Sequence, residues 1–198
     1  MSALPAQTYH HGDLKTQLIR EGLRLLDAEG YQGFTLRKVA KLCGVSQTAP
    51  YRHFKNKDDL IAAITGQALR AFGEQLDSAV QKHPDDPKEQ LREMGVAYVH
   101  FFVNNPEYLR LLFLSDISLR AHLTSMPDVR EHYDSFQFLQ TVTADYVNAT
   151  PNTPFTQNEL MVYSWGLVHG ISTLIATGEL PNNESILKAV DKVLGSIL

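Results

Sequence analysis

The amino-acid sequence predicts an all-α protein of about nine helices in two domains. Apolar residues recur every three or four positions along most of the chain, which is the spacing of one helix face. Proline and glycine, which interrupt helices, gather between these stretches at 29–30, 83–87 and 150–154. No stretch alternates apolar and polar residues as a half-buried strand does. The break at 83–87 separates a domain at 12–72 from a larger one at 84–198.

The amino-acid composition indicates which broad classes of protein are excluded. Hydrophobic residues make up 43% of the 198 residues, enough for a packed core, and the 20% of charged residues argues against a disordered chain. The single cysteine, Cys43, excludes an intramolecular disulfide framework and fits a reducing compartment. The N-terminus lacks the apolar core of a signal peptide, and no apolar run approaches the roughly 20 residues of a membrane span. We therefore expect a soluble, cytoplasmic protein without membrane contact.

Residues 35–57 predict two short helices joined by a tight turn, with a helix-turn-helix motif at about 35–54. Thr35 and Ser46 can cap the first and the second helix, because a hydroxyl accepts from a backbone N–H that the helix leaves unpaired. Gly44 lies between them, where the chain leaves the first helix and φ must turn positive. Many helix corners with a glycine bind nothing, so this geometry alone leaves a purely structural corner open.

The side chains of this motif suit a helix laid into the major groove of DNA. Glutamine can pair with adenine through two hydrogen bonds and alanine can touch a thymine methyl group, so Gln47, Thr48 and Ala49 are candidates for base edges. Candidates for phosphate contacts are Thr35, Arg37, Tyr51, His53 and Lys57, with Ser46 at the helix start. Lys57 begins the next helix, where a cation opposes the helix dipole, and a nearby phosphate would explain it.

The net charge of −4 hides an uneven distribution. Residues 1–57 hold nine Lys and Arg against four Asp and Glu, a balance of +5, while residues 58–198 carry −9. Phosphate neutralisation supplies most non-specific affinity for nucleic acid, so a basic head on an acidic remainder indicates that the head binds DNA. Chance scatter of the charges is the alternative.

Leu36 to Leu60 follow the pattern L-x-x-V-A-x-x-x-G-V-S-x-x-x-x-Y-x-H-F-x-x-K-x-x-L. This pattern resembles the signature of the TetR (tetracycline-repressor) family of bacterial transcription regulators. Tyr9 to Lys15 and Trp165 to Gly170 are similar to one TetR subgroup, and the second segment contains the Trp-x-x-x-His-Gly element of its C-terminal domain. Pro50 departs from the pattern of many relatives. It lacks an N–H, and we expect it to delete the first hydrogen bond of the second helix and to alter operator choice.

A long helix follows the motif. Asn56 can cap it while Asp59 sits three residues on, and Leu60, Phe72 and Val80 belong to an apolar face that continues to about residue 82. No proline or other strong break interrupts this face. We expect a rigid rod that connects the head with the second domain.

The last two helices are so apolar that a further surface must cover them. Helix-turn-helix proteins also gain affinity by reading two half-sites related by a two-fold axis. We therefore expect a homodimer in which these helices pair with their copies, as the TetR resemblance also implies. Candidate interface residues are Trp165, Leu167, Ile171, Leu174, Leu187, Val190 and Leu194. The alternative is that the two helices form the core of a monomer.

Aromatic residues concentrate in the middle helices of the second domain, and pockets for small ligands are apolar with a few polar groups. The TetR resemblance implies an inducer between these helices, and we expect a small apolar or aromatic effector. The candidate pocket region contains Met94, Tyr98, Phe102, Phe113, Tyr133, Phe136, Trp165 and His169. The competing interpretation is an ordinary filled core, in which His169 is packed or hydrogen-bonded.

Together these features predict a sequence-specific DNA-binding transcriptional regulator: a repressor that a small molecule releases from a double-stranded DNA operator. An enzyme is the weakest alternative, because no G-x-S-x-G, G-x-G-x-x-G, phosphate loop or H-E-x-x-H occurs and carboxylates are spread rather than clustered. A DNA-binding helical protein without an effector is the other alternative. No cofactor and no metal site is expected, since the adjacent His10 and His11 lack further ligands at useful spacing.

Overall fold

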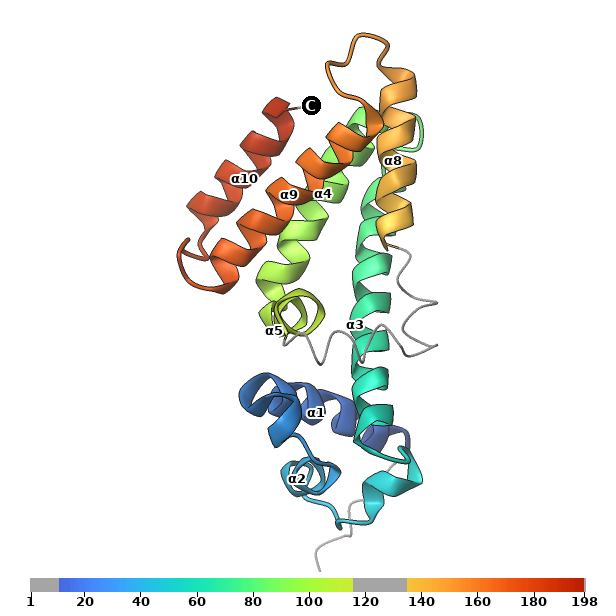
Figure 1. The fold of residues 1–198 in the computed structure, drawn as a ribbon, viewed down its shortest axis with the longest axis vertical. Helices are drawn as coiled ribbons and strands as arrows, with labels where there is room; N and C mark the ends of the chain where they lie inside the picture. Colours follow the sequence, from blue (N-terminus) through green and yellow to red (C-terminus); the bar gives the residue numbers. More distant parts are fainter. Residues whose placement is uncertain (1–10, 116–134, 198) are drawn as a thin grey trace, which may run out of the picture.

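The computed structural model describes residues 11–115 and 135–197, and every regular element in these ranges is helical (Figure 1). In chain order the α-helices are α1 (His11–Gly33), α2 (Leu36–Leu42), α3 (Lys57–Val80), α4 (Pro87–Asn104), α5 (Pro106–Leu109), α8 (Ser135–Ala149), α9 (Gln157–Ala176) and α10 (Glu184–Ile197). A 3₁₀-helix (Ala49–Arg52) precedes α3, and a π-helix (Arg110–Leu114) follows α5 directly. The all-α prediction is confirmed, with eight α-helices in the described ranges where about nine were predicted for the chain.

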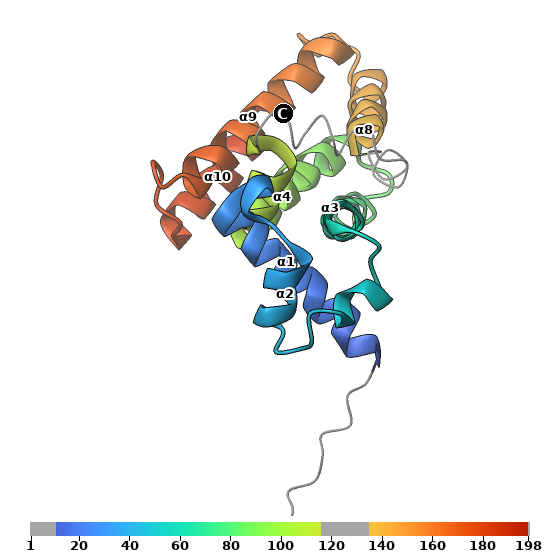
Figure 2. The same ribbon diagram turned by 60° about the horizontal axis from the view of Figure 1, so that its bottom comes forward.

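A head with its own core lies at one end of the molecule and consists of α1, α2, the 3₁₀-helix and the first turns of α3 (Figures 1 and 2). Phe34 and Val39 are fully buried there, as is Leu60 of α3. α1 approaches α3 closely at Gly22, because a Cβ at that position would lie 2.9 Å from Cδ1 of Ile64. The head is therefore tightly packed, and α3 is one of its walls.

Two glycines shape the chain within the head. α1 bends at Gly30, whose φ of 66° lies in the left-handed region that favours glycine. The predicted helix stop at this residue is thus a kink, after which the helix continues to Gly33. Gly44 follows α2 with a φ of 67°, which confirms the positive φ predicted there.

α3 runs from the head into the remaining helices, the body, as one uninterrupted helix (Figure 1). Its predicted cap is confirmed, because the N–H of Asp59 donates to Oδ1 of Asn56 at 2.8 Å. Its 24 residues correspond to a length of about 36 Å at 1.5 Å per residue. Leu60 belongs to the core of the head and Phe72 to the core of the body, so one rigid element joins the two cores.

α4 is the centre of the body, with α3, α8, α9 and α10 packed against it (Figure 1). Because neighbours surround it, it buries Val99 and Phe102 completely. It begins directly after the predicted break at 83–87: Pro87 is its first residue, and Oδ1 of Asp86 accepts from the N–H groups two and three residues further on, both at 3.1 Å.

α9 begins with a capping box. The N–H of Thr156 donates to Oε2 of Glu159 at 2.8 Å, and the N–H of Glu159 donates to Oγ1 of Thr156 at 3.3 Å. α8 is described from Ser135 onward, and residues 116–134 before it lie outside the described residues. No described helix is long and apolar enough to cross a membrane.

Candidate nucleic-acid interface and ligand cavity

α2 presents its polar side to solvent and its apolar side to the head core. Thr35 accepts a hydrogen bond from the N–H of Lys38 at 3.3 Å and is the predicted N-cap. Leu36 and Val39 are buried, whereas Thr35 and Arg37 are exposed. The first helix of the motif therefore leaves one hydroxyl and one guanidinium on the outside of the head.

The second element of the motif differs from the prediction. Ser46 does not cap an α-helix; it stands before a turn and a short 3₁₀-helix. Pro50 explains the difference, because it has no N–H to donate to the carbonyl of Ser46. The N–H of Ala49 donates to that carbonyl instead, at 3.0 Å, and the N–H of Tyr51 donates to the carbonyl of Thr48 at 3.2 Å. The prediction of an α-helix beginning after Ser46 is therefore wrong in start and in type.

Exposure divides the DNA-binding candidates into two groups. The exposed candidates are Thr35, Arg37, Ser46, Gln47, Thr48 and Tyr51. The half-buried candidates are Ala49, His53 and Lys57. Ala49 packs against the head core, and Nε2 of His53 is a buried atom without a hydrogen-bond partner among the described residues. The methyl group of Ala49 and the ring of His53 are thus engaged largely in packing.

Lys57 is held within the head. Its Nζ lies 3.7 Å from the centroid of the Tyr31 ring and donates to the carbonyl of Tyr31 at 3.2 Å. The hydroxyl of Tyr31 donates to Oδ1 of Asp58 at 3.0 Å, and burial followed by this bond raises the pKa of Tyr31. These contacts stabilise a cation at a helix start without DNA. From the sequence, only a DNA phosphate was expected to stabilise the charge of Lys57, because its actual partner, Tyr31, is 26 residues away.

Two exposed cations near the motif, Arg52 and Lys55, were not among the candidates. Both stand in the same basic and aromatic cluster as Tyr51. The sequence shows that Arg52 and Lys55 are positively charged, but only the structure shows that their side chains are exposed. They extend the surface that can meet phosphates.

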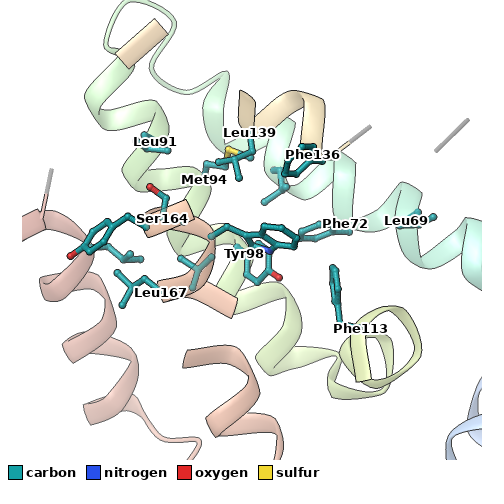
Figure 3. A pocket seen from close by; sticks show the side chains of 16 residues that line it. Leu69, Phe72, Leu91, Met94, Tyr98, Phe113, Phe136, Leu139, Ser164 and Leu167 are labelled. Carbon is teal, nitrogen blue, oxygen red and sulfur yellow. The ribbon is translucent and has the colours of Figure 1, made fainter. Parts of the chain in front are cut away.

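A cavity of about 120 Å³ lies inside the body (Figure 3). The predicted pocket residues that line it are Met94, Tyr98, Phe113, Phe136 and Trp165. Phe102 is not among them, since it is fully buried behind the wall, with its ring centroid 4.9 Å from that of Tyr98. Tyr133 lies outside the described residues. The predicted region therefore contains a cavity, with Phe102 and His169 placed behind its wall.

Most of the cavity wall was not singled out in the sequence. The remaining lining residues are Leu69, Phe72, Leu76, Leu91, Gly95, Leu139, Tyr163, Ser164, Leu167, Val168 and Leu194. They come from five helices, and their spacing along each helix is that of any core residue, so the sequence held no signal for them. None of the described lining residues carries a charge.

His169 stands behind the cavity wall as the partner of Tyr98. Its Nδ1 lies 2.9 Å from the hydroxyl of Tyr98, and its ring centroid lies 5.0 Å from that of Phe113. Burial lowers the pKa of His169, so the ring is neutral at pH 7. A neutral imidazole donates or accepts at Nδ1 according to its tautomer. His169 therefore fixes a wall residue, which is the hydrogen-bonded role that the sequence analysis left open.

The predicted dimer residues differ in exposure. Val190 and Leu194 are buried within one protomer, in the core that α10 shares with α4, which corrects their prediction as interface residues. Trp165 is 38% exposed and lines the cavity. Leu174 is exposed, and Leu167, Ile171 and Leu187 are half-buried. Tyr163 and Val193, within the segments Tyr163 to Thr177 and Ile186 to Leu198 that are expected to pair, are exposed as well, and so is Val162, just before the first segment.

One group of possible metal ligands occurs in the part of the chain that the structure describes. The ligand atoms of His83, Glu89 and Glu93 lie within 4.8 Å of one another. Arg92 already bonds both carboxylates, with Nε 2.7 Å from Glu89 and Nη2 2.6 Å from Glu93. The guanidinium supplies one positive charge against the two carboxylates of this cluster, and its hydrogen bonds already occupy an oxygen of each.

A helix-turn-helix head on a separate helical body with an apolar cavity defines the class of helix-turn-helix regulatory proteins. Residues 18–64 match the bacterial regulatory proteins of the tetR family, and residues 91–196, more than half of the chain, match the tetracyclin repressor-like C-terminal domain. The chain belongs to the tetR family. Members of this family are DNA-binding transcriptional regulators and not enzymes, so the predicted class is confirmed and the enzyme alternative falls away.

Curated relatives match parts of the chain. The HTH-type transcriptional regulator AcrR of Shigella flexneri is 33% identical over 82 residues, which are 41% of this chain and 38% of that protein. The class D tetracycline repressor protein of Escherichia coli is 28% identical over 124 residues, which are 62% of this chain and 50% of that protein. The chain thus spans half or less of the length of these two relatives.

Solved structures match nearly the whole chain. A protein of unknown function from Rhodococcus sp. RHA1 gives a TM-score of 0.72 at 24% identity, covering 98% of this chain and 99% of that one. FadR from Bacillus subtilis, a transcriptional regulator in complex with stearoyl-CoA, gives a TM-score of 0.70 at 17% identity, covering 92% and 98%. At such identities the likeness shows the fold alone.

Proposed function

We propose that this chain is a repressor that binds a double-stranded DNA operator as a homodimer and is released by a small apolar or aromatic effector. The observation that carries the proposal is the continuity of α3, which packs in the head core at Leu60 and lines the cavity at Phe72. Residues 12–72 act as the DNA-binding domain and residues 84–198 as the ligand-binding and dimerisation domain, in the cytoplasm. The segment from Trp165 to Gly170 fits the Trp-x-x-x-His-Gly subgroup.

The exposed polar side chains of the motif support contact with DNA. Gln47 and Thr48 carry an amide and a hydroxyl that can read base edges. The ring of Tyr51 is 54% exposed, although a tyrosine ring is largely apolar, and its hydroxyl can reach a phosphate. Lys57 joins these contacts only if its ammonium group leaves the Tyr31 ring.

The exposed apolar face of α9 and α10 supports the homodimer. Val162, Gly166, Gly170 and Leu174 recur every four residues and share one side of α9. Val162 is 68% exposed, and a Cβ at either glycine would meet nothing within 4 Å. The backbone of a second α9 can therefore approach closely. Val193 of α10 is also exposed, and soluble monomers rarely leave large apolar surfaces uncovered.

The π-helix supports a coupling between the cavity and the head. Phe113 lines the cavity, whereas Leu111 packs in the head core. Arg110 forms a bidentate pair with Asp27 of α1, with Nε 2.6 Å from Oδ1 and Nη2 2.7 Å from Oδ2. Displacement of Phe113 acts on both head contacts, because all three residues share one helical turn. A ligand releases DNA only insofar as it binds the displaced arrangement more tightly.

A DNA-binding helical protein without an effector is the remaining alternative. A filled core in the body would favour it. The cavity, with its rings from Tyr98, Phe113 and Phe136, favours a regulator that responds to a ligand.

Selection of bound sequences from randomised double-stranded DNA tests the proposal. We expect an inverted repeat whose half-sites are spaced for two heads. Gln47→Ala should relax the preference at one base pair by ~1–3 kcal/mol, whereas Gln75→Ala, exposed on α3 within the body, should leave the selected sequence unchanged. A sample without an enriched sequence, or a sedimentation mass of one chain at micromolar concentration, contradicts the proposal.

A further inference from the structure

We infer that the cavity takes an uncharged molecule with a single ring and one hydrogen-bonding group, and that Ser164 binds this group. The inference rests on the proposed function, because it concerns the effector of the same site. It goes further by assigning the charge, the size and the anchor of that effector.

The described part of the cavity wall carries no charged side chain. Sixteen described residues line the cavity, and all of them are uncharged (Figure 3). Transfer of an isolated carboxylate or ammonium group into apolar surroundings is strongly unfavourable unless a partner is present. The titratable ring behind the wall, His169, is neutral at pH 7 and is bonded to Tyr98. An ionised ligand meets no counter-charge among the described lining residues.

The volume of the cavity suits a ligand with one ring. At about 120 Å³ it is close to an engineered cavity of about 150 Å³ that binds benzene. The side chains of Phe72, Tyr98, Phe113 and Phe136 surround this space (Figure 3). Aromatic pairs prefer edge-to-face or offset contacts at centroid separations that such a wall can offer on several sides. A six-membered ring with a short substituent therefore fits.

Two hydroxyls of the wall make no hydrogen bond with another described residue, those of Tyr163 and Ser164, and of these only Ser164 is half-buried, whereas Tyr163 is 39% exposed. The hydroxyl of Tyr98 is engaged with His169, and the ring of Tyr163 stacks on Phe155 with centroids 5.5 Å apart. Ser164 lies half-buried on α9, and its side chain makes no hydrogen bond with another described residue. A half-buried hydroxyl in an apolar wall gains by bonding a polar group of the ligand. A hydroxyl or carbonyl substituent on the ring meets this requirement.

Trp165 makes the inference testable, because it is the single tryptophan of the chain and lines the cavity. The probes are benzyl alcohol, toluene, benzoate and benzylamine, which share one ring and differ in its substituent. We expect benzyl alcohol to change the fluorescence of Trp165 saturably at pH 7. Both ions should bind at least about thirtyfold more weakly, because each must lose its hydration without a counter-charge. Saturation-transfer NMR should give the same order.

Ser164→Ala tests the anchor. The variant should bind benzyl alcohol about two- to tenfold more weakly and toluene equally well, because only the alcohol loses a hydrogen bond. Ser185→Ala, on the exposed start of α10, is the matched control and should change neither affinity. Benzoate that binds as tightly as benzyl alcohol overturns the exclusion of charge. Equal losses for the alcohol and toluene in Ser164→Ala overturn the anchor.

Operator binding by the ligand-free protein, measured in the same preparations, separates this inference from the proposed function. If the operator is bound and none of the four probes binds, the inference fails and the regulator stands. If benzyl alcohol binds in the expected order but leaves operator affinity unchanged, the cavity chemistry holds and release by the ligand fails.

Discussion

The head and the body of this protein differ in how closely two pairs of their aromatic rings are packed. In the head, Phe34 and Phe54 are buried, and α1 approaches α3 so closely at Gly22 that an added Cβ would lie 2.9 Å from the next side chain. In the body, Phe136 and Trp165 stay 37% and 38% exposed at the edge of a cavity. Close packing holds one arrangement, whereas a cavity leaves room for a ligand and for a second arrangement of the helices.

This difference matches the task that each region has in the proposed function. The head must present its polar surface in one geometry, so looseness there would weaken DNA binding. The body must change when a ligand enters. The two regions are joined by α3 and by the pair between Arg110 and Asp27, so these are the places where a change in the body reaches the head.

Truncating one ring in each region should give the largest effect. Phe34→Ala removes a fully buried ring from the head and should lower the free energy of unfolding by about 3–5 kcal/mol. Phe136→Ala removes a ring that solvent and the cavity already border, and should cost about 1–2 kcal/mol. Urea denaturation measures both values. If both variants lose the same free energy of unfolding, the two rings are equally well packed and the contrast between the head and the body is wrong.

Breaking the contact between the regions should have the next largest effect. Arg110→Met keeps an unbranched, flexible stem and removes the bidentate pair with Asp27. Because the pair is partly exposed, the free energy of unfolding should fall by only about 0.5–1 kcal/mol. The change in operator affinity that a ligand causes should shrink about fivefold or more, measured by operator titration with and without ligand.

Lys188→Met is the matched control for Arg110→Met. It breaks the exposed pair with Glu184, whose charged atoms are 2.6 Å apart, and both residues lie on α10. It should change neither stability nor ligand response. If Arg110→Met behaves like this control, coupling passes through α3 alone.

Features of the chain that depend on near neighbours could be predicted from the sequence. The caps at Thr35, Asn56 and Thr156 each need a partner three residues away, and all three are present. The positive φ at Gly44 likewise follows from the end of one short helix. The 3₁₀-helix was missed although its cause is local, because the N–H that Pro50 lacks was treated as a small loss at a helix start.

Features that depend on distant parts of the chain could not be predicted. Lys57 rests on Tyr31, and no pattern within one helix indicates this pairing. Val190 has the spacing of an apolar face in either a dimer or a single protomer, and only the position of α4 assigns it to the protomer. In the sequence, nothing distinguishes Ser164 from other helix residues. Its place in the cavity wall follows only from the packing of α9 against the other helices that line the cavity.

Removing one helix cap in each region should sharpen the comparison with a smaller effect. Thr35→Ala in the head and Asp86→Ala in the body each delete the side-chain cap of a helix, and each should lower the free energy of unfolding by about 1 kcal/mol. Only Thr35→Ala should also weaken DNA binding, to random and operator sequences alike, because its hydroxyl is a phosphate candidate. Urea denaturation and DNA titration give the two readouts. If Asp86→Ala weakens DNA binding as much as Thr35→Ala does, the loss of DNA affinity in both variants results from their lower stability and not from a lost phosphate contact.

The smallest expected effect is a response of the body to pH. Burial lowers the pKa of His169 below its ordinary value of about 6.5. The unfolded chain therefore binds more protons than the native body once the pH falls through about 6.5, so this residue's contribution to stability is intact above that pH and declines below it.

His169→Gln keeps a polar group opposite Tyr98 and removes the titration. Its free energy of unfolding, followed by the fluorescence of Trp165, should fall less between about pH 7 and pH 5 than that of the unaltered protein. If the free energy of unfolding falls equally with pH in the unaltered protein and in His169→Gln, groups other than His169 cause the fall. The buried histidine of the body would then contribute no response to acid.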